Sequence, residues 1–134
     1  MKKILFLLIL VSFILVVGCS GEKEASKAPD SKDSMASLPE GPLALPAESD
    51  PEASKHNEEG IDHWNQGHYD VALKHFNTAS KIDGSSGEVH FNEAISYDKV
   101  NQHEVATKHF KVAQEKANGN TLILESKILL AHVQ

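Results

Sequence analysis

The chain has 134 residues, with 13 lysines, no arginine and 19 acidic residues, for a formal net charge of -6. Nucleic acids and anionic lipid headgroups are bound by basic surfaces, so this acidic balance excludes a protein that works mainly by binding either of them. The single cysteine, Cys19, excludes an internal disulfide.

Residues 1–18 have the pattern of an export signal. Two lysines near the start precede a run from Ile4 to Val17 that is apolar apart from Ser12. A helix of this length spans about 21 Å, which is short of the roughly 30 Å of bilayer hydrocarbon. The run therefore predicts a signal peptide over residues 1–18 rather than a stable transmembrane helix.

The residues Val16 to Ser20 read VVGCS and come directly after the apolar run. This segment resembles the lipobox of bacterial lipoproteins, in which a small residue precedes the one cysteine that is lipidated and becomes the new N-terminus. The resemblance implies a covalent lipid anchor on Cys19 with several acyl chains, and a single chain would bind membranes only reversibly. Ser20 replaces the aspartate that retains such proteins in the inner membrane of enteric-type bacteria, which favours the outer membrane where the cell has one. The alternative is an incidental thiol after an ordinary signal peptide.

Residues 19–50 differ in composition from the remainder of the chain. Ser, Ala, Pro, Glu, Lys and Asp dominate after the cysteine, with four prolines and no aromatic residue. Such a segment cannot bury enough apolar surface to offset its chain entropy, so it predicts a disordered tether spanning roughly 30 Å. Leu38, Leu43 and Leu45 fit either a short partner-docking motif or aliphatic residues scattered in a linker.

Residues 51–134 have helical periodicity and no strand-like alternation. Asp50 and Pro51 suit the cap and the first turn of a helix, and the residues from Ser85 to Glu88 have capping-box spacing. The sequence therefore predicts an all-α domain of about five helices. We expect these helices at residues 51–65, 69–82, 87–100, 103–117 and 121–133.

An internal repeat, in which each position matches the one 34 positions later, runs through this domain. The stretch ALKHFNTA, from Ala72 to Ala79, returns as ATKHFKVA, from Ala106 to Ala113. A fixed period in this range indicates stacked supersecondary units. In each copy two alanines flank a phenylalanine on one helix face, so a second helix can approach closely while the ring fills the gap. The predicted repeat core is Ala72, Phe76, Ala79, Ala106, Phe110 and Ala113.

The repeat resembles the tetratricopeptide repeat (TPR), whose pattern runs small residue, aromatic, glycine at the turn, tyrosine, alanine, aromatic, alanine. The first copy has Gly60, His63, Gly67, Tyr69, Ala72, Phe76 and Ala79 at these positions, and the second has Ala94, Tyr97, Asn101, His103, Ala106, Phe110 and Ala113. The resemblance implies repeats at about 53–86 and 87–120 in a short right-handed superhelical stack. Histidines at positions 56 and 90, where the family has tryptophan, depart from the pattern, as do His63 and Gly84.

In the TPR family the first helix of each repeat lines a concave groove that receives a peptide or a helix. Carried over position by position, the resemblance implies a partner-binding groove made of Asn57, Ile61, Trp64, Phe91, Ile95, Asp98 and Leu129. Exposed aromatic side chains in such a groove would anchor a partner. The alternative for Trp64 and Phe91 is that their rings turn inward and enlarge a thin core. Some members grip a C-terminal carboxylate with lysines and asparagines, but only Asn92 matches that pattern here.

The last segment, residues 121–133, is apolar over more than half of its circumference. Terminal repeats usually have a polar outer face. We interpret the segment as a surface offered to a partner; the alternative is that the core covers it.

Eight histidines raise the question of a metal site. Two histidines of one helix share a metal at i, i+3 or i, i+4 spacing, and no neighbouring pair here has it. The sequence thus predicts no metal and no cofactor beyond the lipid on Cys19, although sites between helices stay open. It also has no Gly-rich phosphate loop, nucleophile elbow or HExxH motif, so we do not expect an enzyme.

Together these features predict a lipid-anchored lipoprotein of the bacterial cell envelope that acts as a protein–protein interaction adaptor through a TPR groove. Its partner would be another protein or a peptide. The alternative function is a self-associating structural module or assembly factor that forms a homo-oligomer through its apolar C-terminal helix.

Overall fold

The computed structural model describes residues 41–134, so the predicted signal peptide, the predicted lipidation site at Cys19 and most of the predicted tether lie outside the described residues. Across residues 41–134 the chain forms six α-helices and no strand, which confirms an all-α domain there. None of these helices is long and apolar enough to cross a membrane. The helices are α1 (Pro51–Asn65), α2 (Tyr69–Ile82), α3 (Gly87–Lys99), α4 (His103–Glu115), α5 (Thr121–Leu124) and α6 (Lys127–Val133).

Two of the long helices begin at side chains that cap their free N–H groups. Asp50 accepts hydrogen bonds from the backbone N–H groups of Glu52 and Ala53, at 2.8 and 3.3 Å. At α3 the cap is Ser86, which accepts from the N–H of Val89, so the cap lies one residue later than the capping box expected at Ser85. These local signals explain why the observed starts of α1 and α3 agree with the predicted ones.

The first four helices form two helical hairpins. Gly67 at the α1–α2 turn has φ +80°, and Asn101 at the α3–α4 turn has φ 63°. Both lie in the left-handed region that glycine and asparagine tolerate best. The two turns therefore reverse the chain at equivalent positions of the internal repeat.

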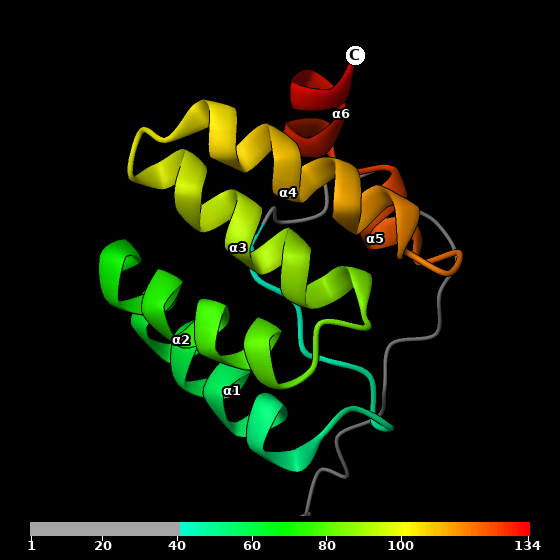
Figure 1. The fold of residues 1–134 in the computed structure, drawn as a ribbon. Coiled ribbons are helices and arrows are strands. Elements are labelled where there is room, and N and C mark those ends of the chain that lie inside the picture. Colours follow the sequence, from blue (N-terminus) through cyan, green and yellow to red (C-terminus); the bar gives the residue numbers. More distant parts are fainter. Residues whose placement is uncertain (1–40) are drawn as a thin grey trace, which may run out of the picture. The chain divides into compact units, whose positions relative to one another are not determined.

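The two hairpins pack side by side through α2 and α3, and α6 lies against α4 (Figure 1). The six alanines and phenylalanines predicted for the repeat core are all 0% exposed. Phe91 and Phe110 meet edge to face, with ring centroids 5.8 Å apart. The repeat pattern thus places its small and large residues at the contacts within each hairpin.

The C-terminal segment is not the single helix 121–133 that the sequence predicts. It breaks at Glu125 and Ser126, and the Ser126 hydroxyl caps α6 by accepting from the N–H of Leu129 at 3.3 Å. The break turns both halves toward the core, where Ile123 and Leu129 are 0% exposed. The structure therefore favours the alternative interpretation, in which the core covers most of this apolar segment. Leu122 remains 43% exposed.

Candidate peptide-binding face of α1 and α3

Residues 41–46, which precede α1, pack against the helices of the domain. Residues 41–46 have no regular secondary structure, yet their backbone and side chains contact α1 and α3. The folded part thus includes residues that were predicted to belong to a disordered tether. The prediction failed because it rested on the polar composition of residues 19–50 as a whole, whereas residues 41–46 read GPLALP and their two leucines pack against the helices.

Two asparagines hold the backbone of one residue of this segment. The side chain of Asn92 on α3 accepts from the N–H of Leu43 at 2.7 Å and donates to the carbonyl of Leu43 at 2.7 Å. The amide of Asn57 on α1 donates to the same carbonyl at 2.9 Å. Asn92 also donates to Asn57 at 2.7 Å, so both hydrogens of its amide are used. The pair recognises the backbone of Leu43, which any extended residue other than proline would present.

The side chains of Leu43 and Leu45 supply the apolar part of the contact. Leu43 packs against the core cluster that contains Phe91 and Ile95. Leu45 packs against a second cluster, formed by Ala53, Ala79 and Val89. Leu43 and Leu45 are therefore not scattered in a linker: both pack against the helices of their own domain.

The predicted groove residues fall into two groups in the structure. Phe91, Ile95 and Leu129 are at most 1% exposed, so their side chains belong to the core and do not line an open groove. The reason is that α3 is packed between α2 and α4, with residues 41–45 on a further side. Asn57 is 1% exposed, because residues 41–46 cover its side chain at Leu43.

The remaining predicted groove residues are half-buried. Ile61 and Trp64 are partly exposed. The Trp64 ring meets Tyr69 edge to face, with ring centroids 4.8 Å apart, and also packs against the core cluster that contains Phe91. Asp98 contacts two histidines, with its Oδ1 2.8 Å from Nδ1 of His103 and 3.0 Å from Nε2 of His132. Only Ile61 and Trp64 therefore stay available, in part, as apolar contacts for a partner.

The role of Asn92 was not predicted from the sequence. This residue was considered only as part of a carboxylate clamp, which needs further lysines and asparagines. A usable signal was present, because Asn92 is a polar residue on a helix whose neighbours Phe91, Ala94 and Ile95 are apolar. A buried amide needs hydrogen-bond partners, and here the partners come from residue 43.

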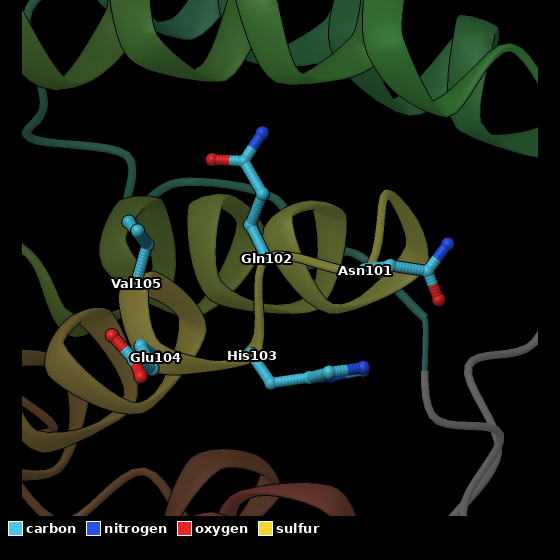
Figure 2. Close-up of a pocket in the computed structure, with 5 residues that line it drawn as sticks. All are labelled: Asn101, Gln102, His103, Glu104 and Val105. Carbon is cyan, nitrogen blue, oxygen red and sulfur yellow. The ribbon is translucent and has the colours of Figure 1, made fainter.

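A hollow of about 360 Å³ at the α3–α4 turn is lined by Asn101, Gln102, His103, Glu104 and Val105. These residues are consecutive, and their side chains point in different directions (Figure 2). A ligand site needs polar groups that converge on one point. The hollow therefore adds nothing to the candidate site.

Potential metal ligands are also brought together in the described part of the chain. These residues include three groups that each consist of two histidines and one carboxylate and combine side chains from more than one helix. The spacing of histidines along one helix does not reveal groups that form between helices.

No model of a known protein family matches the chain, and comparison with curated proteins finds no match.

Proposed function

We propose that this protein is a lipid-anchored lipoprotein of a bacterial envelope whose helical domain binds an extended segment of another protein along α1 and α3. The observation that carries the proposal is the backbone of Leu43, which Asn57 and Asn92 bind through three hydrogen bonds. The membrane anchor rests on the VVGCS segment of the sequence alone. We further infer that the two hairpins are TPR-type units in a right-handed stack, which the equivalence of their turns and cores supports.

Backbone recognition suits an adaptor. Hydrogen bonds to one N–H and one C=O select an extended main chain, and the side chains of Leu43 and Leu45, two positions apart, add a preference for aliphatic residues. This is the division of labour found in peptide-binding domains, where main-chain bonds give affinity and pockets give specificity. The preferred ligand is thus an extended peptide with aliphatic residues at i and i+2.

The protein's own segment occupies this face and competes with any partner. A segment joined by a short connection acts at an effective concentration of about a millimolar or more. A partner must therefore bind more strongly than the segment or act when the segment has been released. Self-association through residues 121–133, the second candidate, has less support, because Ile123 and Leu129 are buried in the same domain.

The first prediction tests this face with the segment itself as the probe. The full chain with Leu43→Asp and Leu45→Asp should release residues 41–45, since buried charge is costly. A fluorescein-labelled peptide with the sequence of residues 38–48 should then bind to this double variant about tenfold or more tightly than to the wild type, in which the attached segment competes. Fluorescence anisotropy measures the binding, and circular dichroism checks that the helices remain.

Two controls define the outcome. Adding Asn92→Ala to the double variant should abolish binding, because a bound leucine backbone then loses both hydrogen bonds to Asn92 and Asn57 loses its partner. A peptide with aspartate in place of Leu43 and Leu45 should not bind. A folded double variant that ignores the unmodified peptide, or that binds both peptides equally, would refute the proposal.

A further inference from the structure

Two clusters of potential metal ligands lie at equivalent positions of the two hairpins. The first consists of His56 and Glu59 on α1 and His75 on α2. The second consists of His90 and Glu93 on α3 and His109 on α4. Each residue of the second cluster follows its counterpart by 34 positions. The internal repeat therefore repeats a set of two imidazoles and one carboxylate together with the core.

The distances within each cluster suit one bound ion. In the second cluster, Oε2 of Glu93 lies 3.1 Å from Nδ1 of His90 and 3.0 Å from Nδ1 of His109. In the first, Oε2 of Glu59 lies 3.4 Å from Nδ1 of His56 and 3.1 Å from Nδ1 of His75. Ligand atoms around a tetrahedral Zn²⁺ are about 3.3 Å apart, given metal–ligand distances of about 2.0–2.1 Å.

The surrounding rings hold the histidines from α2 and α4 in the same way. His63 stacks on His75 with ring centroids 5.3 Å apart, and Tyr97, the counterpart of His63, lies 5.1 Å from His109. Within the clusters the two imidazoles are 5.8 Å apart in the first and 6.1 Å in the second. Both hairpins thus orient their imidazoles with matching geometry.

The hydrogen bonds of His90 show that a positive species belongs between its ring and Glu93. Nε2 of His90 lies 3.1 Å from the carbonyl oxygen of Gly84, which can only accept, so Nε2 carries a hydrogen. In a neutral ring Nδ1 is then a bare acceptor, and it faces a carboxylate oxygen at 3.1 Å. Two acceptors at this distance require a proton or a metal ion between them. An Nε2–H bond to a backbone carbonyl is also the usual outer support of a metal-bound histidine.

Further nitrogens of the clusters lack hydrogen bonds. Nδ1 of His56, His75 and His109 is buried and has no partner with hydrogen-bonding geometry among residues 41–134. Each lies 3.0–3.4 Å from a carboxylate oxygen, without the geometry of a direct N–H···O bond. An ion shared between the three groups would give these nitrogens the partner that they lack.

The side chain of Glu93 is only 4% exposed. A buried carboxylate is costly unless a cation or hydrogen-bond donors compensate it. A carboxylate of Glu93 therefore needs a cation or hydrogen-bond donors beside it, and an ion held between Glu93 and the two imidazoles would supply the positive charge.

We propose that each of the two clusters binds a divalent late first-row transition-metal ion, with Zn²⁺ as the expected ion. Imidazole nitrogen and a carboxylate suit zinc, copper and nickel, whereas magnesium and calcium prefer sites built from oxygen alone. Three protein ligands leave one coordination position for water or another ligand. The third group, Asp98, His103 and His132, has no counterpart one repeat earlier, and its His103 side chain is 60% exposed. It is therefore not a member of the repeated pair.

The test counts zinc ions bound by the full chain after removal of metal with a chelator. Equilibrium dialysis against Zn²⁺ followed by elemental analysis gives the number bound per chain. His75→Gln and His109→Gln should each lower this number by one, and the double variant by two. His68→Gln is the matched control, because His68 is exposed and belongs to none of the three groups. Zinc held by Cys19 or by Asp98, His103 and His132 is common to all variants and cancels in the differences.

Further variants and a second ion keep the result decisive. Glu93→Gln preserves the shape of the side chain and should weaken zinc binding at the second site at least tenfold. Glu59→Gln should weaken the first site to a similar extent, and because the Glu59 side chain is 41% exposed it is less needed for folding. Circular dichroism of the metal-free variants verifies folding, and Mg²⁺ should not replace Zn²⁺. A wild type that takes up no zinc, or folded variants that bind as many ions as the wild type, would overturn the proposal.

Discussion

Gly60 on α1 and Phe76 on α2 pack closely against each other. A Cβ atom built on Gly60 would lie 2.5 Å from Cε1 and 2.7 Å from Cδ1 of the Phe76 ring, which is 0% exposed. The counterpart in the second hairpin is Ala94, so Phe110 packs beside a methyl group that Phe76 does not have. The two repeats have thus adjusted the same contact in different ways.

The second prediction is based on this contact. Gly60→Ala gains about 1 kcal/mol of helix propensity, but overpacking of a filled core costs about 1–3 kcal/mol. We expect a net destabilisation of about 1 kcal/mol, measured by urea unfolding. Gly41→Ala is the control, since nothing lies within 4 Å of a Cβ atom there. A Gly60→Ala variant more stable than the wild type would show that Phe76 has room to move.

The third prediction concerns Asp83, which follows α2 and whose carboxylate accepts a hydrogen bond from the N–H of Asp50 at the start of α1. The Ser85 side chain, and then the N–H groups of Asp50 and Ser85, hold the pKa of Asp83 below its ordinary value. A depressed pKa means that the ionised form stabilises the fold at neutral pH, and this contribution disappears as pH falls through the folded pKa. Asp83→Asn should therefore destabilise the domain at pH 7 and make progressively less difference below about pH 4.

Urea midpoints of wild type and Asp83→Asn at several pH values measure this change. The difference between the two midpoints should shrink as pH falls. A difference that stays constant would mean that the loss of one acceptor oxygen, since the amide nitrogen of asparagine cannot accept a hydrogen bond, matters more than the loss of the charge.

At the scale of whole elements, the break between α5 and α6 determines how the apolar end of the chain is buried. A continuous helix would place its apolar residues around more than half of its surface. The break lets α5 and α6 turn separately, so that Ile123 and Leu129 both reach the core. The Ser126 hydroxyl stabilises the break, because it satisfies the N–H of Leu129 at the start of α6.

The fourth prediction removes this cap. Ser126→Ala should destabilise the domain by about 1 kcal/mol, the usual cost of a lost N-cap, whereas Ser126→Thr keeps a capping oxygen and should cost less. Urea unfolding measures the stability, and hydrogen exchange at the amide of Leu129 reports on the cap itself. Faster exchange is expected in Ser126→Ala only. Unchanged exchange would indicate that the break does not depend on the hydroxyl.

At the scale of the whole helical domain, the proposed peptide-binding face and the two proposed metal sites use neighbouring residues on different sides of the same helices. Asn57 comes directly after His56 on α1, and Asn92 precedes Glu93 on α3. Consecutive residues of an α-helix point about 100° apart, so the asparagines meet residues 41–45 while the ligand residues meet α2 and α4. Loss of peptide binding and loss of zinc are therefore separate measurements.

The sequence by itself was sufficient for features that depend on residues close together in the chain. The bounds of α1 and α2, and the starts of α3 and α4, are explained by caps, helical periodicity and the residues Gly67 and Asn101 at the turns. The burial of the alanines and phenylalanines of the repeat core could also be predicted, because each set lies on one face of a single helix. Local conformational preferences act over three or four residues, and they survive in the folded domain.

Only the tertiary structure decided which surfaces are free and which polar groups meet. Leu43 and Asn92 are 49 positions apart, and no local pattern links them. The burial of Phe91 and Ile95 depends on α2, α4 and residues 41–45 together, so a groove inferred from α3 alone is too open. The histidine clusters likewise form only when two helices pack, since an imidazole of one helix reaches the carboxylate of its neighbour through the hairpin contact. Burial and ligand geometry arise from packing between distant segments, which helical periodicity does not encode.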